Sequence, residues 1–85
     1  MKQFDYTITD ALGIHARPAG LLAKEAKKFQ SVCTLTKGDV TRKLTQLMML
    51  MSMGIKCGDV VTVRAEGADE DAAIAALEAF FRDNL

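Results

Sequence analysis

The sequence predicts an α+β open-faced β-sandwich, in which three helices cover one face of a four-stranded, mainly antiparallel sheet. Three observations carry this prediction. Four segments alternate apolar with polar residues, three others repeat their apolar residues at helical spacing, and the segments follow in the order β-α-β-β-α-β-α. We expect a single domain over residues 1–85, because a chain of this length builds only one core.

The first half of the chain predicts a strand, a helix and a hairpin. Phe4, Tyr6 and Ile8 alternate with polar residues, which is typical of a half-buried strand. From Pro18 onward the apolar residues recur at helical spacing. These residues are Ala19, Leu22, Ala26 and Phe29. Gly38 predicts a turn between SVCTLT and DVTRKL, because glycine supplies the positive φ that a tight hairpin needs.

The second half predicts a helix, a strand and a longer helix. The segment TQLMMLMSMG reads as a short helix that Gly54 ends. The segment DVVTVRAEG is rich in β-branched residues and alternates, so it predicts the fourth strand. The final helix, DEDAAIAALEAFFRDNL, begins with acidic residues, as the helix macrodipole favours. Its apolar stripe is formed by Ile74, Leu77 and Phe81.

Composition and charge exclude several classes of protein. Lys+Arg and Asp+Glu both number 11, so the basic excess of a nucleic-acid-binding face is missing. We find no secretion signal and no apolar run near the roughly 18 residues of a membrane span. We therefore expect a cytoplasmic protein without membrane insertion. Cys33 and Cys57 lack C-x-x-C spacing and are expected to be reduced thiols.

The segment GIHARPAGLL contains the only histidine and the only proline of the chain, His15 and Pro18. Proline is tolerated in the first turn of a helix, so the helix is expected to begin near Ala16 or Arg17. The first turn offers free N–H groups to an anion, and the Arg17 guanidinium suits phosphate oxygens. Neutral imidazole is a nucleophile near pH 7. These residues are consistent with a site that takes a phosphoryl group onto His15.

Other interpretations of the same residues stay open. A lone histidine before a helix is more often an exposed turn residue than a nucleophile. We expect no metal site, because the sequence places no cysteine, carboxylate or second histidine close to His15. The segment LMMLMSM is apolar on nearly every side of a helix, so part of it should form an exposed docking surface. The chain could therefore be a binding module that docks through this helix, with His15 incidental.

LGIHARPAGLLAKEAKKF resembles the active-site segment of the HPr family, the histidine-containing phosphocarriers of the bacterial sugar phosphotransferase system. MSMGIKCGDVVTV and AEGADEDAAIAALEAF resemble the family's second helix with its following strand, and its last turn and helix. The resemblance implies that His15 receives a phosphoryl group from enzyme I on its δ1 nitrogen and passes it to the IIA component of a sugar permease. It further implies that Arg17 and the backbone N–H of Ala16 contact the phosphate.

By the same resemblance the chain is a stoichiometric carrier and not an enzyme, with no cofactor, and we expect a monomer. The family's contact face lies on its first two helices. The matching positions are Gly20, Leu21, Lys24, Leu47, Met48 and Met51. Gln46 stands where the family usually has a serine that an ATP-dependent HPr kinase modifies, so this kinase is doubtful as a partner. A paralogue that uses the same phosphohistidine for regulation, not for sugar uptake, is the nearest alternative.

Overall fold

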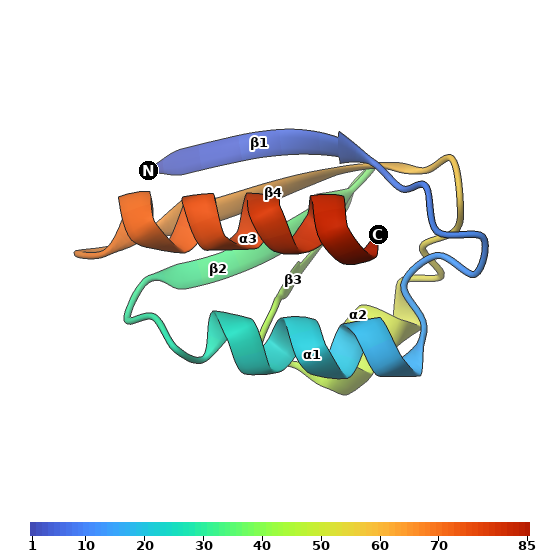
Figure 1. The fold of residues 1–85 in the computed structure, drawn as a ribbon, viewed down its shortest axis with the longest axis horizontal. Coiled ribbons are helices and arrows are strands. Elements are labelled where there is room, and N and C mark those ends of the chain that lie inside the picture. Colours follow the sequence, from blue (N-terminus) through green and yellow to red (C-terminus); the bar gives the residue numbers. More distant parts are fainter.

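The computed structural model describes residues 1–85 and contains the predicted elements in the predicted order (Figure 1). The elements are β1 (Lys2–Thr7), α1 (Ala16–Ala26), β2 (Val32–Lys37), β3 (Val40–Lys43), α2 (Leu47–Ser52), β4 (Val60–Glu66) and α3 (Glu70–Asn84). The strands lie in the order β1-β4-β2-β3, and each neighbouring pair is antiparallel. The α+β class with a four-stranded antiparallel sheet and three helices is confirmed.

The core lies between the sheet and the helices. Val61 and Val63 on the central strand β4 are completely buried, and the register places Val63 opposite Phe4 of β1. Phe81 of α3 meets the rings of Phe4 and Tyr6 edge to face, with centroids 5.7 and 5.5 Å apart. Alternation along the strands therefore buries one face of the sheet, as the period-two pattern predicts. The other face carries polar side chains that bond to one another across the strands.

The apolar stripes of the two long helices face this core. Leu22 of α1 and Leu77 of α3 are completely buried, and α3 runs along β1 and β4 while α1 lies beside α2 (Figure 1). Phe29 is half-buried against the core, but it follows the end of α1. It is therefore a loop residue that packs on the core, not a member of the helical stripe. The short helix α2 stops before Gly54, whose φ of 66° suits a residue without a Cβ.

Two carboxylates tie the loops to the rest of the fold. Asp69, just before α3, accepts hydrogen bonds from the backbone N–H of Gln30 and from both the N–H and the hydroxyl of Ser31. Asp59, just before β4, accepts from the ammonium of Lys37 and the N–H of Lys56, each at 2.8 Å. Asp69 thereby joins α3 to the loop after α1, and Asp59 joins the end of β2 to the turn before β4.

Candidate functional site

His15 is the residue immediately before α1, and its backbone is extended, with φ −111° and ψ −175°. Its carbonyl accepts the first bond of the helix from the N–H of Ala19 at 2.9 Å. The imidazole makes no hydrogen bond to the helix end and is 38% exposed. The helix start that Pro18 predicts is therefore confirmed, with Ala16 as the first helical residue.

The first turn of α1 leaves two backbone donors free. Pro18 has no N–H, and the N–H of Ala19 is already bonded to His15. The remaining first-turn donors are the N–H groups of Ala16 and Arg17, which have no partner inside a helix. No acidic residue lies in this turn, and the exposed Arg17 takes part in none of the ion pairs of the structure. The helix end next to His15 is thus positive and able to meet an anion.

The loop before His15 is fixed by close backbone contacts. The N–H of Gly13 donates to the carbonyl of Asp10 at 2.9 Å, and the N–H of Ile14 donates to the carbonyl of Ile55 at 3.2 Å. Gly13 has a φ of 68°, and a Cβ built there would lie 2.2 Å from the Ile55 oxygen. Glycine is therefore required two residues before His15 for both its conformation and its lack of a side chain.

The turn at residues 10–13 brings a carboxylate next to the imidazole. Oδ1 of Asp10 lies 3.9 Å from Nε2 of His15, and the same oxygen accepts a hydrogen bond from the N–H of Leu12 at 2.8 Å. The expectation that no carboxylate lies near His15 was wrong. The chain reverses between Asp10 and Gly13, so a residue five positions earlier returns to the ring. One carboxylate and one histidine do not form a metal site, and no group of three potential ligands occurs.

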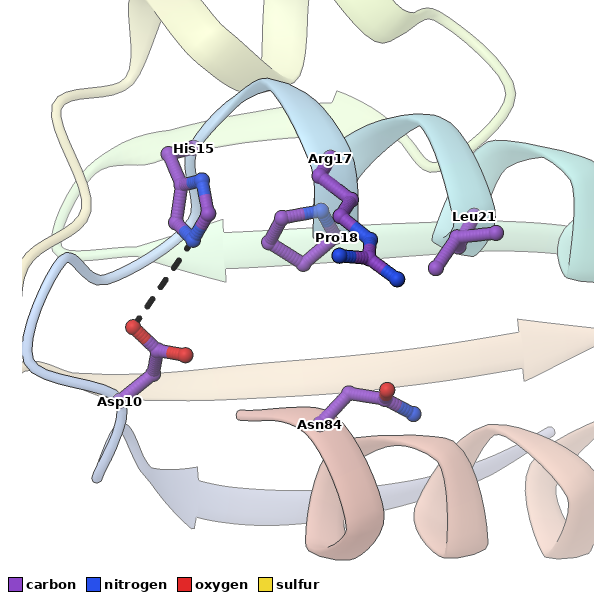
Figure 2. A pocket seen from close by; sticks show the side chains of 6 residues that line it. All are labelled: Asp10, His15, Arg17, Pro18, Leu21 and Asn84. Atoms are coloured by element: carbon purple, nitrogen blue, oxygen red, sulfur yellow. Dashed lines mark ion pairs between the residues drawn. The ribbon is translucent and has the colours of Figure 1, made fainter.

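An open pocket of about 250 Å³ surrounds these groups (Figure 2). It is lined by Asp10, His15, Arg17, Pro18, Leu21 and Asn84. Arg17 and Leu21 extend from α1, whereas Asn84 comes from the end of α3 and donates to the carbonyl of Phe80 at 3.1 Å (Figure 2). Sequence reasoning missed Asp10 and Asn84. No local pattern could have found Asn84, because only the packing of α3 beside α1 places it here.

The predicted contact residues lie on two neighbouring helices, and we call their surface the α1–α2 face. It consists of Gly20, Leu21, Lys24, Leu47, Met48 and Met51. Leu50 of α2 is completely buried and anchors the helix, whereas Met48 is 75% exposed and Met51 40% exposed. Leu47 and Gly20 are half-buried and contribute less surface. The apolar helix therefore turns all three of its methionines to solvent, and Gln46 is exposed just before its start.

The remaining features bear on stability more than on chemistry. Both cysteines are free thiols; Cys57 is exposed and Cys33 is buried. Burial, with a smaller contribution from Asp69, raises the pKa of the Cys33 thiol. Its nucleophilic thiolate is therefore disfavoured. None of the helices has both the length and the hydropathy needed to cross a membrane.

The fold and the site define a class: a small α+β domain that presents one histidine at a helix N-terminus, beside an arginine. The family model described as "PTS HPr component phosphorylation site" matches residues 2–83. The chain is 45% identical to phosphocarrier protein HPr of Mycoplasma genitalium, over 99% of this chain and 97% of the relative. It therefore belongs to the HPr family of phosphocarriers of the phosphotransferase system.

Solved structures agree with this assignment. A Mycoplasma histidine-containing phosphocarrier protein superposes with a TM-score of 0.94 at 43% identity, covering 96% of this chain and 93% of the other. HPr from Thermoanaerobacter tengcongensis gives a TM-score of 0.93 at 37% identity, covering 98% and 93%. As a member of the family, the chain is a phosphocarrier and not a catalytic enzyme. It relays phosphoryl groups from enzyme I to IIA components for sugar transport.

Proposed function

We propose that His15 is the residue that carries the phosphoryl group, and that its Nδ1 atom accepts it. The observation that supports this most is the position of His15 at the start of α1, beside the free N–H groups of Ala16 and Arg17. The imidazole is accessible, so the phosphate oxygens can be met by protein donors while the reacting atoms stay open to a partner. Such a site can release the group again to the next acceptor.

The transfer proceeds by in-line displacement at phosphorus. The lone pair of Nδ1 forms the new N–P bond, while the bond between phosphorus and the donor breaks and its electron pair leaves with the donor. The N–H groups of Ala16 and Arg17 donate to the phosphate oxygens, and the Arg17 guanidinium balances their charge. Passing the group to the IIA component reverses these steps at His15, with the electron pair returning to Nδ1.

The α1–α2 face is the surface that we propose for docking enzyme I and the IIA components. The face combines exposed methionines with Leu21, which also lines the pocket, so a partner seated on this face would reach His15. Flexible thioethers adapt to several partners, as a relay requires. Lys24 adds a positive charge for acidic partner surfaces. We expect the carrier to act as a monomer in the cytoplasm, where one face has to serve partners in turn.

HPr kinase is not a partner in this proposal. Gln46 occupies the place of the usual serine acceptor, and an amide cannot take a phosphoryl group. Met49 is exposed one helical turn after Gln46 and adds bulk at the place a kinase would approach. Neighbouring Thr45 is a poor substitute because it lies one position earlier in the chain than the usual serine. The Ser52 hydroxyl already donates to the carbonyl of Met49 at 2.7 Å. We therefore expect this chain to lack the serine-based regulation of the family.

Labelling with phosphoenolpyruvate and enzyme I tests the role of His15. We expect one phosphoryl group per chain, in an acid-labile and alkali-stable bond, and phosphorus NMR to assign it to Nδ1. His15→Ala should abolish labelling and leave the melting temperature nearly unchanged, because the imidazole is partly exposed and contributes no helix cap. Labelling that survives this substitution contradicts the proposal. Phosphate that is accepted but never passed to a IIA component would favour the regulatory paralogue.

A further inference from the structure

We propose that Asp10 is a positioning residue, which holds the imidazole proton of His15 on Nε2 and so leaves Nδ1 free to accept the phosphoryl group. The inference rests on the proposed role of His15. It is carried by the approach of the Asp10 carboxylate to the Nε2 side of the ring, at 3.9 Å (Figure 2).

The choice of tautomer decides which ring nitrogen can react. Neutral imidazole has one N–H and one nitrogen with a lone pair, and only the second is a nucleophile. A carboxylate facing one nitrogen favours the tautomer with the proton on that side. With Asp10 facing Nε2, the lone pair of His15 therefore lies on Nδ1. This is the nitrogen that the proposed transfer uses.

The carboxylate is held in place from both sides of its residue. Its Oδ1 atom accepts from the N–H of Leu12 at 2.8 Å. The N–H of Asp10 donates to the main-chain oxygen of Leu85 at 2.8 Å, and its carbonyl accepts from Gly13 at 2.9 Å. Three bonds thus fix the backbone and the side chain of Asp10 next to the ring. Oδ2 is left without a protein donor and can accept a second bond.

Transfer leaves the proton count unchanged and makes the ring positive. The Nδ1 lone pair becomes the N–P bond and Nε2 keeps its proton, so the phosphorylated imidazole carries a positive charge that faces Asp10. When the group leaves, the electron pair returns to Nδ1 and the ring is neutral again. The charged residues that line the pocket with the ring are Asp10 from the loop and Arg17 from α1, while α3 contributes only the neutral Asn84.

The size of the effect follows from distance and exposure. The separation of 3.9 Å is about 1 Å longer than a charge-assisted hydrogen bond, and the two side chains are 38% and 31% exposed. Water therefore screens the attraction, and removing the charge should slow transfer roughly two- to fivefold. This is smaller than the effect expected at a residue that touches the phosphate.

The test compares Asp10→Asn with Asp71→Asn. The asparagine at position 10 keeps an oxygen for the N–H of Leu12, removes the charge and replaces the second oxygen by an NH2 group of similar size. Asp71 is an exposed carboxylate in the first turn of α3, about 20 Å along that helix from Asn84, so it matches the charge change away from the pocket. We would measure the rate of phosphoryl transfer from enzyme I, and the nitrogen-15 shifts of the neutral His15 ring.

For Asp10→Asn we expect slower transfer and a smaller population of the Nε2–H tautomer, while Asp71→Asn behaves as wild type. Asp10→Glu should recover part of the loss. An Asp10→Asn protein with wild-type rate and ring shifts overturns the proposal and leaves Asp10 with only its bond to Leu12. Should that variant fold poorly, the nitrogen-15 shifts of the wild-type ring decide. A neutral His15 protonated mainly on Nδ1 would also overturn the proposal. Absence of labelling in the wild type would instead reject the proposed function.

Discussion

Arg17 is the only cationic side chain among the residues that line the pocket around His15. It is exposed, and no carboxylate pairs with it, so its guanidinium can turn toward an arriving phosphate without breaking a bond in the resting protein. Arginine offers a planar fork of donors that matches phosphate oxygens. Its contribution should therefore arise during transfer and hardly at all in the stability of the fold.

Arg17→Ala should slow phosphoryl transfer by about ten- to a hundredfold, which corresponds to roughly 1.5–3 kcal/mol for a hydrogen bond to a charged group. The melting temperature should stay within a few degrees of wild type. Stopped-flow or quench measurements of transfer from enzyme I check the rate, with Arg64→Ala on the outer face of β4 as the matched control. A large loss of stability with unchanged transfer would make Arg17 a structural residue.

The residues of the site differ in how well their positions could be predicted from the sequence. Pro18 marks the first turn of α1, so the places of His15 and Arg17 at the helix start could be predicted locally. Asp10 and Asn84 could not, since one returns through a turn and the other arrives with α3. The requirement for glycine at position 13 likewise depends on the Ile55 carbonyl, which lies more than forty positions along the chain.

At the scale of elements, α2 combines a buried anchor with an exposed apolar surface. Leu50 is fully buried, whereas Met48 points its side chain into solvent. A helix of six residues has little stability of its own, so its packing through Leu50 keeps it in place. The exposed methionines can therefore contribute to the α1–α2 face without reducing the packing of the core.

Met48→Glu should weaken binding of enzyme I by about tenfold, because it puts a charge into the centre of the proposed contact. The fold should tolerate it, since the Met48 side chain is 75% exposed. Titration calorimetry with enzyme I measures the affinity. Val60→Glu, at an exposed apolar position of β4, is the matched control. Equal losses in the two variants, or none in Met48→Glu, would move the docking surface elsewhere.

The types and order of the elements were predictable because each long segment has a clear apolar period. The residues at which the elements end were harder to predict, as α1 shows. Its apolar spacing continues to Phe29, but the helix ends at Ala26. The carboxylate of Asp69 binds the N–H groups of Gln30 and Ser31, and these bonds lead the chain out of the helix toward β2. A contact between residues 38 or 39 positions apart cannot be found from the local period.

At the scale of the whole molecule, the loop-binding carboxylates of Asp69 and Asp59, which we call the two carboxylate clamps, make the free energy of unfolding depend on pH. The hydrogen bond from the Ser31 hydroxyl, with others from backbone N–H groups, lowers the pKa of Asp69. The hydrogen bond from Lys37, supported by the Lys56 N–H, lowers the pKa of Asp59. Because both values are lower in the folded than in the unfolded chain, the unfolded chain takes up protons first as pH falls. Their stabilisation is complete above the ordinary aspartate value and is lost below it.

We therefore expect the urea midpoint to fall as pH drops below about 4 toward the lowered folded-state values. Asp69→Asn should have a lower midpoint at pH 7 and a shallower decline in acid, because one clamp no longer titrates. Urea titrations followed by circular dichroism between pH 7 and acid measure both. Asp39→Asn, in the exposed β2–β3 turn, supplies the control. Equal declines in wild type and Asp69→Asn would show that this clamp does not govern acid stability.

The N–H groups of Thr9 and Asp10 both donate to the main-chain oxygen of Leu85, which joins segments 76 residues apart for Thr9. Proteins are made from the N-terminus onward, so His15 leaves the ribosome long before this acceptor exists. The partner of β1 is also made late, since β1 pairs only with β4. A nascent chain thus carries His15 in a loop whose hydrogen-bond partners have not yet been made. We therefore expect the proposed phosphoryl acceptor to be presented in its final geometry only after β4 and α3 have been made and packed.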